Sequence, residues 1–248
     1  MEIPANSLTR RASKLLKGTA IGERLYGLVN SKTSYSQFGE DLHIASYYAR
    51  LAYEKHIPVR NGCIVDVGAF RPVMFSNTYY FYRRGWRSIN IDPTPGSKAI
   101  FDRVRPKDTN LEFAIATSDG VGTFYSFGAP CVFNTMDPET AQNTAETTGI
   151  VPKEYKVEKW RLESVLDRYL NGQAFELLTI DAEGYDIEVL GSNNFSKYRP
   201  RLIMVEVHGA ALETIRENEV IRYCTQCGYV LHSWINPNLF FVRSDSTL

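Results

Sequence analysis

Four ionisable residues stand directly after two apolar runs in the C-terminal half of the chain. Asp181 and Glu183 follow one run, and Glu206 and His208 close the other, LIMVEVH. Because parallel strands end at the same edge of a sheet, we expect the four side chains in one cleft. An imidazole has an ordinary pKa close to neutral and can take a proton from a hydroxyl group when a carboxylate orients it. The pattern therefore predicts general-base chemistry on an acceptor hydroxyl, with His208 as the base and Asp181 and Glu183 beside it as catalytic carboxylates.

Two other interpretations of this cluster stay open. Carboxylates and one imidazole also suit a divalent metal, Mg²⁺ or Mn²⁺, that holds a pair of acceptor hydroxyls. Alternatively, Asp181 caps the next helix and His208 is an ordinary loop histidine. We favour the base and do not assign a metal to the site.

A second group of residues is typical of a nucleotide pocket. The first buried run contains Asp66 and is followed by Gly68 and Ala69, and the second is followed by Asp92. An acidic side chain at the end of the second strand can accept both hydroxyls of an adenosine ribose. The glycines that make room for a pyrophosphate, in the pattern GxGxxG, are absent. The pattern favours S-adenosylmethionine (SAM), with Asp66 at its ammonium group and the amides of Gly68 and Ala69 at its carboxylate.

The elements that must position these residues follow from the apolar runs. Strands are expected at residues 62–67, 88–91, 111–116, 177–180 and 202–207, and helices at 76–84, 98–104, 162–170, 185–190 and 217–227. Residues 229–234 and 239–242 predict a C-terminal β-hairpin. Residues 122–127 alternate like a hairpin strand, and we expect the polar segment 137–149 to be mobile. The alternation of strands and helices is typical of a doubly wound, mostly parallel α/β sheet.

Four blocks of the sequence carry a resemblance to a known family. They are SQFGED from Ser36, VDVGAFRPVMFSNTYYFYRRGWRSINIDPTP from Val65, LLTIDAEGYDIEVL from Leu177 and PRLIMVEVH from Pro200. In this order they resemble the FkbM-type family of SAM-dependent methyltransferases. The resemblance implies a seven-stranded, Rossmann-like sheet of the class I methyltransferase type. It also implies methyl transfer to an oxygen, commonly on a sugar or a polyketide product.

Further cofactor contacts are expected at other positions. The resemblance gives a lid role for Gln37 at the methionine end of SAM the same weight as the alternative, a helix that starts at Ser36. Ser76, Asn77, Ala116 and Asp181 are additional candidates for cofactor contacts. Phe70 occupies a position where many methyltransferases of this class have a second glycine.

Composition limits the partners. The chain has 28 basic and 28 acidic residues, so it lacks the net positive field that attracts nucleic acid. Residues 1–35 form a basic extension, predicted to be helical, that either packs on the methyltransferase domain (36–248) or contacts a membrane surface or partner. Neither a membrane-spanning apolar run nor a secretory signal is seen, so we expect a cytoplasmic protein that acts on a small molecule or glycan.

Two rival functions belong to other classes. Tyr155 and Lys159 match the Tyr-x-x-x-Lys spacing of nicotinamide-dependent reductases, but that pair needs a helix, and the segment alternates like a strand. The other rival is a non-catalytic SAM-binding or scaffold module, against which the acidic cluster with His208 argues.

Overall fold

The computed structural model describes residues 16, 18–57, 60–128, 131–209 and 211–246. The chain divides by its internal contacts into Met1–Ser34 and Tyr35–Leu248. In the first part, helix α2 (Ala20–Asn30) begins after Thr19, whose hydroxyl accepts the N–H of Gly22 at 3.0 Å. Residues 1–15 and 17 of the basic extension lie outside the described residues, and its contact with a membrane or partner stays a prediction. Among the described helices, none is long and apolar enough to cross a membrane.

The described residues of the second part form a seven-stranded sheet in the order β3-β2-β1-β7-β8-β10-β9. Its strands are β1 (Cys63–Val67), β2 (Arg87–Ile91), β3 (Thr109–Leu111), β7 (Leu177–Ile180), β8 (Leu202–Glu206), β9 (Tyr229–Ile235) and β10 (Asn238–Arg243). The first five strands of the spatial order run parallel, whereas β10 is antiparallel to both β8 and β9. The α/β class and the terminal hairpin are as predicted, but the sheet is mixed: its parallel part ends at β8.

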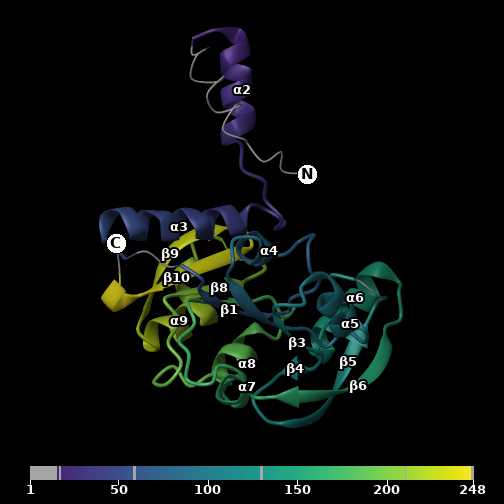
Figure 1. The fold of residues 1–248 in the computed structure, drawn as a ribbon. Helices are drawn as coiled ribbons and strands as arrows, with labels where there is room; N and C mark the ends of the chain where they lie inside the picture. The colour runs from purple at the N-terminus through teal and green to yellow at the C-terminus, as the bar shows by residue number, and fades with distance from the viewer. Residues whose placement is uncertain (1–15, 17, 58–59, 129–130, 210, 247–248) are drawn as a thin grey trace. The chain divides into compact units, whose positions relative to one another are not determined.

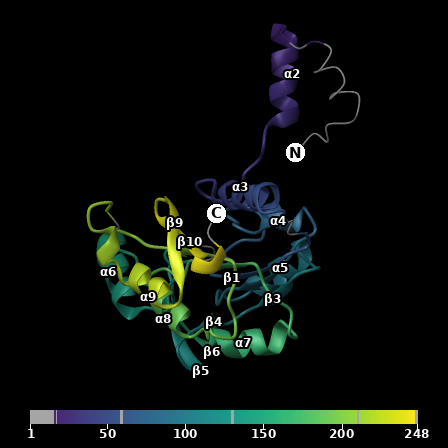
Figure 2. The same ribbon diagram turned by 90° about the vertical axis from the view of Figure 1, so that its left-hand side faces the viewer.

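Helices pack on both faces of this sheet. They are α3 (Glu40–Glu54), α4 (Tyr79–Tyr82), α5 (Ser97–Val104), α7 (Leu162–Tyr169), α8 (Asp186–Gly191) and α9 (Glu219–Gln226). Side chains alternate along a strand, so Ile64 of β1 joins the apolar cluster of α3 and α4, while Val65 joins that of α7, α8 and α9. Figures 1 and 2 show α3 and α4 on one side of the sheet and α7 and α8 on the other. The apolar runs therefore form strands that are buried on both faces, as parallel strands usually are.

The prediction of one third strand over residues 111–116 is wrong. β3 ends at Leu111, and β4 (Ala114–Ile115) belongs to a second sheet, which the described residues form in the order β4-β6-β5. Between them, the Glu112 carboxylate accepts the backbone N–H groups of Gly96 and Lys98 at 3.0 and 3.2 Å. This contact ties the chain to the start of α5 and turns it out of the main sheet.

Residues 114–160, which we call the insert, contain a helix that we did not expect. The segment predicted to be mobile forms α6 (Pro138–Thr148), because the Asp137 carboxylate accepts the N–H of Thr140 at 2.7 Å and caps the helix. Gly149 ends α6 with a φ of +71°. β5 (Gly120–Ser126) precedes α6 in the sequence and β6 (Lys153–Trp160) follows it, and the two strands pair with each other in antiparallel orientation. Tyr155 and Lys159 lie on a strand, so they lack the helical geometry that a reductase would need.

Candidate active site

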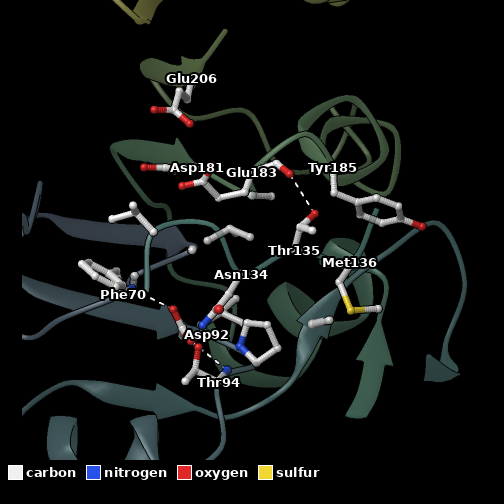
Figure 3. Close-up of a pocket in the computed structure, with 18 of the residues that line it drawn as sticks. Phe70, Asp92, Thr94, Asn134, Thr135, Met136, Asp181, Glu183, Tyr185 and Glu206 are labelled. Carbon is white, nitrogen blue, oxygen red and sulfur yellow. Dashed lines mark hydrogen bonds between the residues drawn. The ribbon is translucent and has the colours of Figure 1, made fainter. Parts of the chain in front are cut away.

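A cavity of about 460 Å³, a size usual for small-molecule sites, opens at the carboxyl ends of β1, β2, β7 and β8. Most of the predicted site residues line it: Gln37, Asp66, Gly68, Ala69, Asn77, Asp92, Asp181, Glu183 and His208. Figure 3 shows Phe70 and Asp92 on one side of this space and Asp181, Glu183 and Glu206 on the other. The fold thus brings the predicted nucleotide residues and the acidic cluster to one cavity.

Two predicted cofactor residues lie elsewhere. Ser76 is buried, and its hydroxyl accepts the N–H of Tyr79 at 3.1 Å, which places it at the start of α4. Ala116 is buried beside the insert sheet, where its N–H donates to the carbonyl of Trp160 at 2.9 Å. Neither residue lines the cavity. Ser76 is thus held by a contact within its own turn, and Ala116 by a contact to the end of β6.

The loop after β1 departs from the expected arrangement. The N–H groups of Gly68 and Ala69 both donate to the carbonyl of Ile91, at 2.9 and 3.2 Å. These two amides are therefore engaged by β2 and do not serve as the anion site that we predicted for the carboxylate of SAM. Gly68 has a φ of +79°, and a Cβ there would lie 1.6 Å from the carbonyl oxygen of Asp181. The close approach that requires glycine is to the end of β7.

Asp92 holds the same loop from the other side. Its Oδ2 accepts the N–H of Phe70 and its Oδ1 that of Thr94, both at 2.8 Å (Figure 3). Phe70 has a φ of +51°, a conformation that a side chain rarely adopts without such support. Burial raises the pKa of Asp92, and the hydrogen bonds from Thr94 and Phe70 oppose this effect. Each carboxylate oxygen keeps a second lone pair, so Asp92 can still accept the hydroxyls of a ribose.

The ionisable groups at the ends of β7 and β8 change one another's pKa. His208 Nε2 lies 2.9 Å from Oε2 of Glu206 and 4.0 Å from Oε2 of Glu183. Contact with Glu206 raises the pKa of His208 to about 8. Burial, reinforced by the charge of Glu206, raises the pKa of Glu183 to about 8 and that of Asp181 well above its ordinary value. An exposed imidazole therefore stands against a nearly buried carboxylate at the edge of the cavity.

Among the described residues, no side chain caps the helix α8 that follows β7, so Asp181 does not have the capping role considered above. The carboxylate of Asp186 accepts the N–H groups of Ala182 at 2.9 Å and of Gly184 at 3.2 Å, and so closes the loop that carries Glu183. Asp181 is thereby left to the cavity. Burial raises the pKa of Asp186 to about 6.

The insert supplies cavity residues that sequence reasoning missed. Thr135, Met136, Thr140 and Tyr185 line the side nearest Glu183, all but Tyr185 from the insert. The hydroxyl of Thr135 donates to the carbonyl of Glu183 at 2.8 Å (Figure 3). Nothing in the local sequence marks these residues, because only the folding of the insert against the β7 loop brings them to the cavity.

Residues 66–231 match the model of the methyltransferase FkbM domain family. The chain belongs to this family. The match extends from β1 into β9, and so it contains both Asp92 and the acidic cluster of this FkbM methyltransferase. No curated protein matches the sequence. Among solved structures, the chain is similar to a TehB-like SAM-dependent methyltransferase from Corynebacterium glutamicum, with 9% identity and a TM-score of 0.34 over 82% of this chain and 96% of that one.

The FkbM family implies SAM, and the cavity fits such a ligand in most of its chemistry. Asp66 is almost fully buried where it meets the cavity, and a buried carboxylate is a suitable partner for an ammonium group. Asp92 retains lone pairs for hydroxyl groups. With the loop amides engaged, the side-chain amides of Gln37 and Asn77, which also line the cavity, can donate hydrogen bonds to a carboxylate.

A divalent cation remains an alternative use of the cluster in this FkbM methyltransferase. One ligand atom from each of Glu183, Glu206 and His208 lies within 4.8 Å of the others among the described residues. Such a set suits Mg²⁺ or Mn²⁺. The ion pair between His208 and Glu206 is the competing use of two of these groups, and chelation distinguishes the two uses.

Proposed function

We propose that this FkbM methyltransferase is an O-methyltransferase that transfers the methyl group of SAM to a hydroxyl of a small molecule or glycan, such as a sugar or natural-product precursor. The observation that carries the proposal is the ion pair between His208 and Glu206 on the cavity that also contains Asp66 and Asp92. The site thus joins a base to a pocket suited to adenosine.

SAM, when bound, supplies a methyl group on a positively charged sulfur that a nucleophile can displace. In the proposed mechanism Asp66 holds the ammonium group, Asp92 the ribose hydroxyls, and Gln37 with Asn77 the carboxylate. His208 keeps a proton on Nε2, facing Glu206, and accepts the proton of the acceptor hydroxyl at Nδ1. Methyl transfer to oxygen needs only a modest base, because alignment and exclusion of water supply much of the acceleration.

Titration calorimetry with S-adenosylhomocysteine (SAH) and with NADPH tests this function against its rivals. We expect SAH to bind with a micromolar Kd and NADPH to give no heat. Binding of NADPH instead would support the reductase, and binding of neither ligand would support the scaffold. A panel of sugar nucleotides and free sugars, assayed for methylated product by mass spectrometry, then tests the acceptor class.

Asp92→Ala is expected to weaken SAH binding by about 1.5–3 kcal/mol, the usual effect of losing hydrogen bonds to a charged group. The variant loses the ribose acceptors and also frees the loop at Phe70. Asp119→Ala is the matched control, since Asp119 accepts the N–H of Arg161 at 2.6 Å away from the cavity. An Asp92→Ala protein that folds and binds SAH as the wild type does would remove Asp92 from the cofactor site.

A further inference from the structure

A buried arginine is linked to the cavity through one threonine. Arg105 Nη1 donates to the hydroxyl of Thr78 at 2.9 Å, and that hydroxyl donates to Oδ2 of Asp66 at 2.9 Å. Arg105 and Thr78 are fully buried, and Asp66 is 3% exposed. Of the three, only Asp66 lines the cavity. Arg105 and Thr78 therefore reach a ligand only through Asp66.

The direction of each hydrogen bond in this chain is forced by its chemistry. A guanidinium group has donors and no acceptor, and a hydroxyl group has a single hydrogen. Thr78 therefore accepts from Arg105, and it gives its own hydrogen to Oδ2 of Asp66 at 2.9 Å in preference to the hydroxyl of Ser76 at 3.4 Å. The arrangement works only while Oδ2 of Asp66 carries no proton, and it leaves Oδ1 for a ligand.

The charges around Asp66 oppose one another. Burial raises its pKa to about 6, with smaller contributions from the carboxylates of Asp92 and Asp108, whereas Arg105 and the Thr78 hydroxyl lower it. Arg105 also pairs with Asp108, Nη2 to Oδ2 at 2.6 Å, so its charge is shared between the two carboxylates. Burial thus disfavours the ionised form of Asp66, and the link to Arg105 through Thr78 favours it.

We propose that Arg105 is a positioning residue for the cofactor, acting through Thr78 to hold Asp66 as an oriented, ionised carboxylate for the ammonium group of SAM. The role of Arg105 in binding SAM rests on the proposed function, whereas its effect on the charge of Asp66 does not. Arg105 lies outside the sequence blocks quoted above and directly follows α5, and its link to Asp66 of β1 is seen only in the folded structure.

Thr78→Val tests the link, because valine has nearly the shape of threonine and leaves the Arg105–Asp108 pair intact. We expect its Kd for SAH to be about tenfold weaker than that of the wild type at about pH 5, below the pKa of Asp66 in both proteins, which corresponds to a change of about one pKa unit. At about pH 8.5 Asp66 is ionised in both proteins, and the difference should shrink to about twofold. Thr78→Ser restores the hydroxyl and should restore binding.

Thr179→Val is the matched control. Thr179 is fully buried and pairs in register with Asp66 across β1 and β7, and its hydroxyl has no hydrogen-bond partner among the residues that the structure describes. The same substitution therefore changes the surroundings of Asp66 without breaking a link to it. We expect no difference in SAH affinity that depends on pH.

Thermal unfolding without ligand gives a second measurement. A carboxyl group whose pKa is raised by folding binds more protons in the folded than in the unfolded protein, so stability falls as pH rises toward that pKa. Thr78→Val raises the pKa of Asp66 further and extends the fall to higher pH. The Tm difference between Thr78→Val and the wild type should grow by about 3 °C between about pH 5 and pH 8, and that for Thr179→Val should not change.

The outcomes separate the two proposals. If the wild type binds SAH and Thr78→Val binds it equally well at the lower pH, the role of Arg105 is overturned while the methyltransferase stands. If the wild type does not bind SAH, the proposed function fails and the Tm comparison decides the link. Growth of the Tm difference with pH then supports the control of Asp66 by Arg105, and a constant difference overturns it.

Discussion

Replacing His208 with alanine is expected to lower kcat by about 10²-fold or more, the usual contribution of a positioned base, and to leave the Kd for SAH within about twofold of the wild type. The imidazole lies against Glu206 on the acceptor side, whereas the proposed cofactor contacts come from Asp66 and Asp92. The measurement compares single-turnover rates and calorimetric affinities. His232→Ala, an exposed histidine of β9 that does not line the cavity, is the control.

The pH dependence of kcat provides a sharper form of this prediction. A base must be neutral, and Glu206 raises the pKa of His208 to about 8, so kcat should rise with pH through about 8. Glu206→Gln removes the charge that holds the proton on the imidazole. We therefore expect the rising limb to move to lower pH, and the maximal rate to fall because Nε2 loses its carboxylate partner.

The alternatives for the cluster predict different results. If a metal is required, activity should disappear with EDTA and return with Mg²⁺ or Mn²⁺. Glu206→Ala should then lose as much activity as His208→Ala. If the role of His208 is only structural, His208→Ala should have a lower Tm than the wild type without a specific loss of turnover. Full activity of His208→Ala would exclude it as the base and leave Glu183, whose pKa is raised to about 8, as the next candidate.

Gly68→Ala is expected to abolish measurable SAH binding and to lower the free energy of unfolding by about 2–5 kcal/mol. The estimate combines left-handed backbone strain of about 1–2 kcal/mol with overpacking of about 1–3 kcal/mol. The added Cβ would stand 1.6 Å from the carbonyl of Asp181, so the loop after β1 must separate from the end of β7. Urea unfolding and calorimetry measure the two effects.

A second glycine separates backbone strain from collision. Gly172 has a φ of +78°, close to that of Gly68, but no atom lies within 4 Å of the Cβ position. Gly172→Ala should therefore cost only about 1–2 kcal/mol of strain and leave SAH binding intact. If Gly68→Ala behaves like Gly172→Ala in both measurements, the loop does not pack on β7 as described.

The strands of the main sheet could be predicted because each is marked by a short run of residues in the sequence itself. Runs such as Leu177–Ile180 are apolar on both faces and end in polar residues, and that pattern predicts a buried parallel strand and its functional end. Placement of Asp92 and Asp181 at one cavity then follows from topology alone. Their roles in binding and catalysis remain proposals.

The errors arise where long-range contacts decide. Gly68 and Ala69 looked like free donors, but the register of β2 places the carbonyl of Ile91 against both N–H groups. Glu112 lies within an apolar run and nevertheless turns the chain, because its carboxylate meets the start of α5. The helix α6 is a different case: Asp137 followed by proline is a local start signal, and the polar composition of the segment obscured it.

The attachment of the insert to the β7 loop limits how acceptor preference can change. Thr135 holds the carbonyl of Glu183, and Thr140 lies so close to Gly184 that a Cβ there would be 2.6 Å from its hydroxyl oxygen. A chimera that exchanges the insert alone would therefore also displace Glu183. We therefore expect that the insert and residues 181–186 must be transplanted together, because they form one wall of the cavity and carry the proposed catalytic residue Glu183.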